Sequence, residues 1–286
     1  MIEARYVTID SALGFVEIVH PTGGSTVTDE AAPTVLCIHT AGQNGVQWRH
    51  VASALAAEGY RVVVPDLPGH GRSEPAAKGP VTDLTVYGDW LWKLLDALGI
   101  ERPYVIGCSI GGKLTLDLAT RPERPLAGAI AMAAEAGPGR VNVAGLRREL
   151  EDVAGPSRGE RTYLGTLASV GDTVSPDRAD LIATMHRRED PLISSSDLIG
   201  WGNHDIRERL CLTTCPVHLV AGEQDPWIVP DTVKADASRI RGSRFTLLIG
   251  IGHYPMEEVD DFAGVAAAWL GELADAPLSE RAEAAS

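Results

Sequence analysis

Ser109 is the residue whose type and neighbours point most directly to covalent chemistry. It stands in the middle of residues 107–111 (GCSIG), a G-x-S-x-G pattern. Small residues on both sides allow a sharp turn from a strand into a helix, and such a turn exposes the serine hydroxyl above a sheet. The helix that follows would direct its N-terminus toward the same place, where it favours negative charge. The pattern predicts that Ser109 is a nucleophile for acyl transfer.

A second copy of this pattern shows that the five letters alone are weak evidence. Residues 155–159 (GPSRG) have the same spacing around Ser157. No apolar strand precedes them, no helix with a regular apolar face is evident after them, and we expect them in a polar loop. Because the motif needs a strand before it and a helix after it, the context favours Ser109 and rejects Ser157.

A serine nucleophile needs a base, and His253 is the candidate. It lies in residues 250–255 (GIGHYP), just after the last apolar segment, where glycines and a proline define a tight loop. Such a loop suits an imidazole that must be aimed at the strand ends. The position of His253 after both the serine and an acidic candidate fits the chain order serine, acid, histidine.

The base in turn needs a carboxylate that holds its tautomer, and we expect Asp225 in that role. Asp225 follows the apolar segment 216–221 (PVHLVA), again at the end of a strand. Glu135, just after the preceding strand, ranks second as the acid. Glu223 ranks third because a residue that leaves the strand at once is less able to reach across.

The oxyanion of a tetrahedral intermediate needs two fixed hydrogen-bond donors. The backbone N–H of Ile110, directly after the nucleophile, is expected to supply one. The second should come from the loop at 39–42 (HTAG), which follows the apolar segment 34–39. Within this loop we expect His39 to shape the backbone and not to carry a proton.

Short apolar segments that alternate with amphipathic ones must position these residues. After an antiparallel pair formed by RYVTI and LGFVEIV, we expect strands at 34–39, 61–65, 104–107, 126–132, 216–221 and 245–249. Helices are expected at 46–58, 82–98, 110–120, 231–240 and 258–273. This alternation predicts an α/β fold, a mostly parallel sheet with helices on both faces.

The alternation stops between about 135 and 210, where several stretches favour helix and none reads as a buried strand. We interpret 135–208 as a helical cap inserted over the site. Residues 1–134 and 209–275 then form the α/β core, and we expect the Ala/Glu-rich tail at 276–286 to be frayed.

The composition narrows the classes of partner. A net charge of −14 without a Lys/Arg cluster argues against nucleic acid or an anionic membrane. The first residues lack the features of a signal peptide, so we expect a cytoplasmic protein that acts on a small molecule, and a homodimer stays open. Cys37 and Cys108 are expected to be reduced and packed. Cys211 and Cys215 have no metal-ligand spacing, so we expect no zinc there, although a bridge between the two stays open.

Five motifs together resemble the serine-nucleophile branch of the α/β-hydrolase superfamily, over nearly the whole chain except the expected cap. They are HTAG at 39–42, DLPGHGRS at 66–73, GCSIG at 107–111, GEQD at 222–225 and GHYP at 252–255. The resemblance implies the α/β-hydrolase fold. It also implies that Ala41, the second residue after the loop histidine, gives the second oxyanion N–H. DLPGHGRS is similar to a largely structural turn of the family, so His70 is not expected to be catalytic.

One residue departs from the family pattern. The family usually has glycine after the loop histidine, whereas this chain has Thr40, whose hydroxyl is a candidate substrate contact. Plant hydroxynitrile lyases of this fold also have threonine there, but they have lysine where this chain has Tyr254, which disfavours a cyanohydrin lyase. Epoxide hydrolases and haloalkane dehalogenases of this fold attack with aspartate at the turn, which Ser109 excludes.

The sequence therefore predicts a serine hydrolase of carboxylic esters or lactones that needs no metal, nucleotide or flavin. Hydrolysis of a C–C bond next to a ketone is the alternative, since the same three residues serve it, and a catalytically silent ligand receptor is a third reading. Trp201 is a candidate substrate contact from the expected cap. Tyr163, Met185 and His186 are positional guesses of the same kind, and core packing is the competing explanation for each of them.

Overall fold

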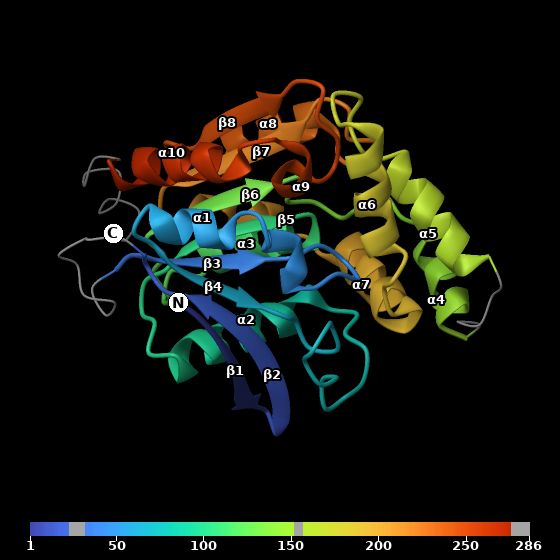
Figure 1. Ribbon diagram of the computed structural model, residues 1–286, viewed down its shortest axis with the longest axis horizontal. Coiled ribbons are helices and arrows are strands. Elements are labelled where there is room, and N and C mark those ends of the chain that lie inside the picture. Colours follow the sequence, from blue (N-terminus) through green and yellow to red (C-terminus); the bar gives the residue numbers. More distant parts are fainter. Residues whose placement is uncertain (23–31, 152–156, 276–286) are drawn as a thin grey trace.

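The part of the chain that the structure describes forms a sheet of eight strands. The computed structural model describes residues 1–22, 32–151 and 157–275, except for the side chains of 149–151. The strand order is β1-β2-β4-β3-β5-β6-β7-β8. β1 pairs with β2, and β2 with β4, in antiparallel fashion, and the remaining pairs are parallel (Figure 1). The bounds are β1 Ile2–Ile9, β2 Ala12–Val19, β3 Thr34–Ile38, β4 Arg61–Pro65, β5 Tyr104–Cys108, β6 Gly128–Met132, β7 Val217–Gly222 and β8 Arg244–Leu248.

Continuous apolar runs form the centre of the sheet because these strands are covered on both faces. Every residue of β6 and β7 is buried, and so are the last four residues of β3 and of β5. β1, at one edge, is mostly exposed. The burial follows from the helices, which lie on both sides of the sheet, and the predicted α/β fold class is confirmed.

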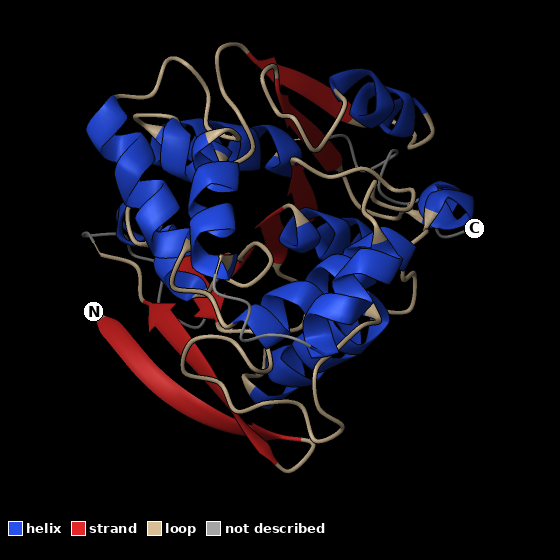
Figure 2. Ribbon diagram, turned by 90° about the vertical axis from the view of Figure 1, so that its right-hand side faces the viewer, coloured by secondary structure: helices blue, strands red, loops and turns tan. Residues whose placement is uncertain are grey.

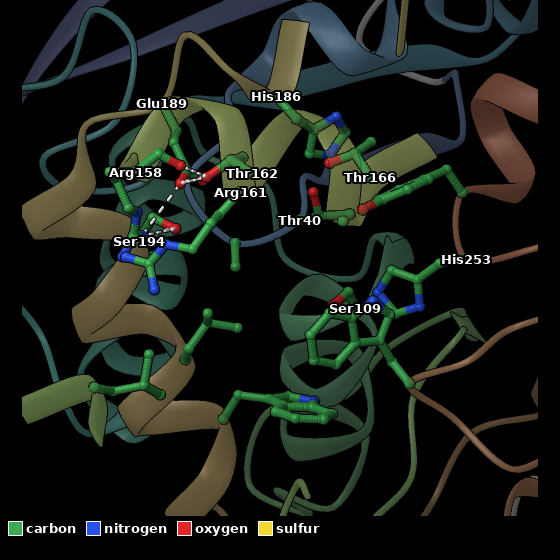
Figure 3. A pocket seen from close by; sticks show the side chains of 17 residues that line it. Thr40, Ser109, Arg158, Arg161, Thr162, Thr166, His186, Glu189, Ser194 and His253 are labelled. Carbon is green, nitrogen blue, oxygen red and sulfur yellow. Dashed lines mark hydrogen bonds and ion pairs between the residues drawn. The ribbon is translucent and has the colours of Figure 1, made fainter. Parts of the chain in front are cut away.

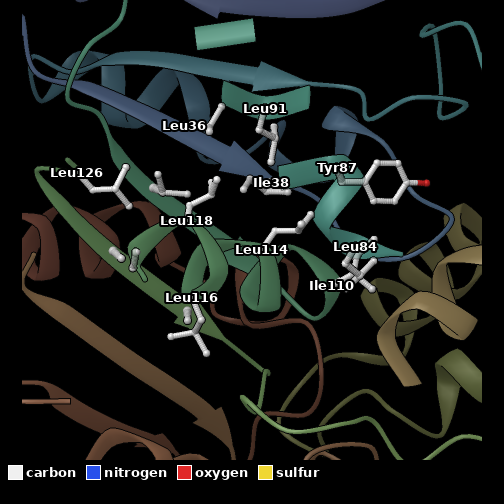
Figure 4. Packing of buried hydrophobic residues seen from close by; sticks show 14 of the residues in the cluster. Leu36, Ile38, Leu84, Tyr87, Leu91, Ile110, Leu114, Leu116, Leu118 and Leu126 are labelled. Atoms are coloured by element: carbon white, nitrogen blue, oxygen red, sulfur yellow. The ribbon is translucent and has the colours of Figure 1, made fainter. Parts of the chain in front are cut away.

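Two apolar clusters join the helices to the two faces. One contains α2 (Leu84–Ala97), α3 (Ile110–Ala119) and α8 (Pro230–Ser238), and the other contains α1 (Ala52–Ala57) and α10 (Phe262–Ala274). Figure 4 shows Leu114 and Leu118 of α3 packed among side chains of β3 and α2. Each fully buried leucine contributes about 1.5–3 kcal/mol to folding. This packing fixes α3, whose first residue follows Ser109.

Between β6 and β7 the chain forms helices that lie beyond the ends of the parallel strands (Figures 1 and 2). They are α4 (Val143–Glu151), α5 (Arg158–Leu167), α6 (Pro176–His186) and α7 (Pro191–Asn203), followed by a 3-10 helix, η3 (Arg207–Leu212). We refer to residues 143–203 as the helical insertion. The cap boundaries at 135 and 208 stay a prediction. The tail at 276–286 lies outside the described residues.

Two expected single helices are interrupted. The segment 46–58 forms the 3-10 helix η2 (Gly45–Trp48) and then α1, because the Asn44 side chain caps η2 and Trp48 is fully buried. The segment 258–273 forms α9 (Pro255–Glu258) and then α10. Val259 is extended between them, and Asp261 caps α10 through the N–H of Gly264.

The four cysteines are free, and of them only Cys211 is exposed, so no bridge joins it to Cys215. Burial raises the pKa of the Cys215 thiol to about 12 and that of the Cys108 thiol well above its usual range. Within the described ranges, no helix combines the length and the apolar character needed to cross a membrane.

Candidate active site

Ser109 occupies a strained turn between β5 and α3. Its φ is +59° and its ψ is −119°, a backbone conformation that residues other than glycine rarely adopt. The positions on either side of the turn have no room for a larger residue than glycine. A Cβ at Gly107 would collide with the carbonyl of Gly111, and a Cβ at Gly111 would collide with the carbonyl of Ile38. The surrounding packing maintains this strained backbone conformation. The Ser109 side chain lines a pocket.

His253 and Asp225 form a buried pair next to this turn. The imidazole Nδ1 lies 2.7 Å from Asp225 Oδ2. Since the carboxylate can only accept, Nδ1 carries the proton and Nε2 is left as the basic nitrogen. The other carboxylate oxygen, Oδ1, accepts from the N–H groups of Trp227 and Ile228 at 2.8 and 3.1 Å. Figure 3 shows the His253 ring beside the Ser109 hydroxyl.

The two other carboxylates considered for the acid serve different purposes. Glu223 accepts from the backbone N–H of Gly250 at 3.0 Å. Glu135 is buried near Lys113, and burial raises the pKa of its carboxyl. The structure therefore brings Asp225 to His253, as the sequence predicted.

A carboxylate that the sequence analysis missed organises the His253 loop. Glu258 is buried and accepts from the N–H groups of Gly252, Tyr254 and Gly171, at 2.6, 2.8 and 2.9 Å respectively. Burial raises the pKa of Glu258. The His253 N–H donates to the carbonyl of Ser169, which lies between α5 and α6, so the helical insertion also holds this loop.

Most polar groups of the loop at 39–42 already form hydrogen bonds within the protein. Both the N–H and the hydroxyl of Thr40 donate to Gln47 Oε1, at 2.9 and 3.1 Å. The N–H of Gly42 donates to Asp197 Oδ2 at 2.9 Å. Among the described residues, the N–H groups of Ala41 and Ile110 have no acceptor. These two are the donors that the sequence analysis expected for an oxyanion.

The two buried histidines near this loop have structural contacts. His39 Nδ1 donates to the Thr40 carbonyl and its Nε2 accepts from the Leu67 N–H. Burial lowers the pKa of His39 to about 4, so it is neutral at pH 7. Burial opposes the charged form of His70 too, but Asp197, 2.7 Å from its Nε2, outweighs this and raises the pKa. Neither histidine lines the pocket.

The pocket is a cavity of about 310 Å³ between the strand ends and the helical insertion. Thr40 and Trp201 line it, as expected. The Thr40 hydroxyl donates its hydrogen bond to Gln47 and not into the cavity. His186 lines it as well, whereas Tyr163 and Met185 are not among the described residues that do so. Its apolar lining comes from Ala41, Leu146, Leu198, Trp201, Trp227 and Tyr254.

His186, which lines this cavity, has a buried and unpaired acceptor nitrogen within the described part of the chain. Its Nδ1 donates to the Ile182 carbonyl at 2.9 Å, which leaves the lone pair on Nε2. Burial lowers the pKa of His186, so the ring is neutral at pH 7. Within the described part of the chain, Nε2 has no partner. The ring is held against Tyr254, with centroids 4.5 Å apart.

A set of polar residues on the helical insertion faces the same cavity and was not expected from the sequence. It comprises Arg158, Arg161, Thr162, Glu189 and Ser194. The expectation that residues 155–159 form a polar loop is wrong at its end, because α5 begins at Arg158. The signal was present in the sequence: arginines three positions apart share one face of a helix.

Comparison with known proteins agrees with this architecture. A family model described as the alpha/beta hydrolase fold matches residues 33–259, which confirms the resemblance found in the sequence. The 3-hydroxybutyrate-oligomer hydrolase of Cupriavidus necator is 28% identical over 249 residues, 83% of either chain. The magnesium-chelatase 30 kDa subunit of Rhodobacter capsulatus is 41% identical over 87 residues, which span only 30% of its length.

Solved structures show the same fold. A thermophilic esterase from Thermogutta terrifontis superimposes with a TM-score of 0.77 at 23% identity, over 95% of this chain and 99% of that one. At this identity the likeness concerns the fold alone.

Proposed function

This chain belongs to the alpha/beta hydrolase fold family, and within that family we propose that it is a serine hydrolase of carboxylic esters or lactones. The observation that carries the proposal is the buried His253–Asp225 pair beside Ser109, at the wall of a cavity that Ala41 also lines. Among the described residues, the backbone N–H groups of Ala41 and Ile110 have no acceptor. Nucleophile, base, acid and anion donors are the four parts that acyl transfer to water requires.

In the acylation step, Ser109 Oγ attacks the substrate carbonyl carbon while His253 Nε2 takes the hydroxyl proton. Asp225 stabilises the imidazolium that results, because its Oδ2 already accepts from Nδ1. The carbonyl π electrons move onto oxygen, and the N–H groups of Ala41 and Ile110 stabilise this oxyanion, each by about 3 kcal/mol. When the carbonyl re-forms, the C–O bond to the leaving group breaks and His253 returns the proton to the alcohol.

Deacylation repeats the sequence with water as the nucleophile. His253 Nε2 takes a proton from water as its oxygen attacks the acyl carbon, and the same two N–H groups hold the second oxyanion. Collapse releases a carboxylic acid and returns the proton to Ser109 Oγ. The helical insertion supplies most of the remaining cavity wall, so we propose that it selects the substrate.

The lyase alternative has little support at this site. Tyr254 stands where the lyases carry a lysine, and it is buried with its ring against His186 and His253. A phenol has no cationic form, and burial raises the pKa of this one well above the usual value, so it stays neutral.

The test compares wild type, Ser109→Ala and Ser157→Ala on p-nitrophenyl butyrate, with circular dichroism to show that the variants fold. Ser157 is the matched control because it stands in the same five-residue pattern, is exposed and does not line the cavity. We expect Ser109→Ala to lose turnover and Ser157→Ala to keep it. Equal turnover in wild type and Ser109→Ala would refute the proposal.

A further inference from the structure

The cavity has a polar wall that the proposed acyl chemistry does not use. Figure 3 shows Arg158, Arg161, Thr162, Glu189 and Ser194 together on the side of the cavity opposite Ser109 and His253. The first three belong to the start of α5, Ser194 belongs to α7, and Glu189 lies just before α7. We call these five residues the polar wall.

Arg158 is held in a defined orientation within this wall. Its guanidinium donates to Ser195 Oγ at 2.9 Å, to Glu189 Oε1 at 3.2 Å and to Ser194 Oγ at 3.3 Å. Thr162 donates to the same Glu189 oxygen at 2.9 Å. The Arg158 side chain is only 15% exposed and that of Glu189 only 8%. These contacts hold the donors of the guanidinium that they do not use in a fixed direction.

Arg161 adds a second guanidinium to the same wall. It lies three residues after Arg158, and therefore on the same face of α5, and it is exposed at the cavity rim. Among the described residues that line the cavity, Glu189 is the only carboxylate outside the proposed catalytic machinery, against two guanidinium groups. This is a concentration of cationic donors in a chain with 39 acidic and 25 basic residues.

A substrate that placed an apolar group against this wall would remove the exposed guanidinium of Arg161 from water, which is costly. A carboxylate placed there would accept charge-assisted hydrogen bonds of the bidentate kind that arginine forms best. We propose that the polar wall binds a free carboxylate of the substrate, with Arg158 and Arg161 as the donors. This inference rests on the proposed ester hydrolysis. The substrate is then an ester or lactone that carries a carboxylate at the end away from the scissile bond.

The net charge of the protein makes this inference testable. At −14, the chain as a whole repels an anionic substrate, so a preference for one must come from local contacts. The substrates are mono-p-nitrophenyl glutarate, which has a free carboxylate, and its methyl-capped diester, which has the same chain and no charge. The variant is Arg161→Gln, because this residue is exposed and its replacement leaves the Arg158 contacts in place.

Arg187→Gln is the matched control. Arg187 lies at the end of α6, pairs with Glu160 at 2.6 Å, and does not line the cavity. The control therefore removes the same charge from the same insertion without touching the polar wall. Thermal denaturation of each variant separates loss of folding from loss of binding.

We expect wild type to have a lower KM for the monoester than for the capped diester. Arg161→Gln should raise the KM for the monoester on the order of 10- to 100-fold and leave its kcat unchanged. The KM for the capped diester should stay the same. Arg187→Gln should behave as wild type. Equal KM values for the two substrates in wild type, or an equal change in both variants, would overturn the inference.

A binding measurement keeps this inference separate from the proposed function. Isothermal titration of Ser109→Ala with monomethyl glutarate should show binding that the additional change Arg161→Gln abolishes. If no ester is turned over but this binding is found, the ester hydrolysis is refuted and the carboxylate site stands. If esters are turned over but monomethyl glutarate does not bind, the polar wall has another role and the inference is wrong.

Discussion

The backbone N–H of Gly42 donates to the carboxylate of Asp197 over a distance of 2.9 Å. Gly42 lies in the loop that carries Ala41, whereas Asp197 lies in α7 of the helical insertion. Asp197 is fully buried and also accepts from His70 Nε2 at 2.7 Å and from the Tyr87 hydroxyl at 2.8 Å. One carboxylate thus joins the insertion, the turn at His70 and the proposed oxyanion loop.

Asp197→Asn should therefore weaken both stability and catalysis. Asparagine has one acceptor oxygen for the three donors that now share a carboxylate, so at least one buried donor loses its partner. We expect the free energy of unfolding to fall by about 1–3 kcal/mol. We also expect kcat to fall while KM changes little, because the oxyanion loop loses its anchor. Chemical denaturation and steady-state kinetics measure the two effects.

Asp190→Asn on the same helix is the control for this prediction. Asp190 caps α7 through the Leu192 N–H, and asparagine caps a helix about as well as aspartate. The control should leave both quantities unchanged. A kcat in Asp197→Asn equal to that of wild type would show that the anchor has no influence on the reaction.

Asp225→Asn should reduce kcat on the order of 10³- to 10⁴-fold with little loss of structure. An amide at this position can donate to Nδ1, which favours the tautomer that places the proton on Nε2, where the reaction needs a lone pair. Glu223→Gln is the companion variant, because Glu223 accepts from the Gly250 N–H and, among the described residues, makes no contact with His253. A larger loss in Glu223→Gln than in Asp225→Asn would move the acid role to Glu223.

Gly111→Ala should destabilise the protein by more than about 1 kcal/mol, because the new Cβ would lie against the backbone carbonyl of Ile38, which cannot move aside. Gly271→Ala is the matched control in α10, where a Cβ meets nothing within 4 Å. There alanine should stabilise by about 0.5–1 kcal/mol. The free energies of unfolding of both variants measure the contrast, and similar values would mean that the turn at Ser109 is looser than described.

His218 should make the protein less stable as the pH falls below neutral. Burial lowers the pKa of His218 to about 4, below the value near 6.5 of an exposed histidine. Between these values the unfolded chain binds the proton and the folded chain does not, so stability is present above pH 6.5 and is lost toward pH 4. The free energy of unfolding of wild type relative to His218→Leu should fall by about 1–3 kcal/mol between pH 7 and pH 4. A pH-independent difference would contradict the shift.

The features that sequence predicted well are those encoded by local pattern. Apolar runs placed the central strands, and the residues at their ends placed Ser109, Asp225 and His253 near one another. The contacts of Asp197 could not be predicted, because they join residues 110 to 155 positions apart and nothing around Asp197 marks it. The polar wall was missed for a related reason: which helix faces turn toward a cavity depends on how the insertion packs.

The central claim is that Ser109 is an activated nucleophile, and covalent labelling tests it most directly. The intact protein is treated with a fluorophosphonate, digested, and the modified peptide is identified by mass spectrometry. The adduct should lie on Ser109 alone, and Asp225→Asn should slow its formation. An unmodified protein, or an adduct on Ser157 with Ser109 unmodified, would contradict the claim.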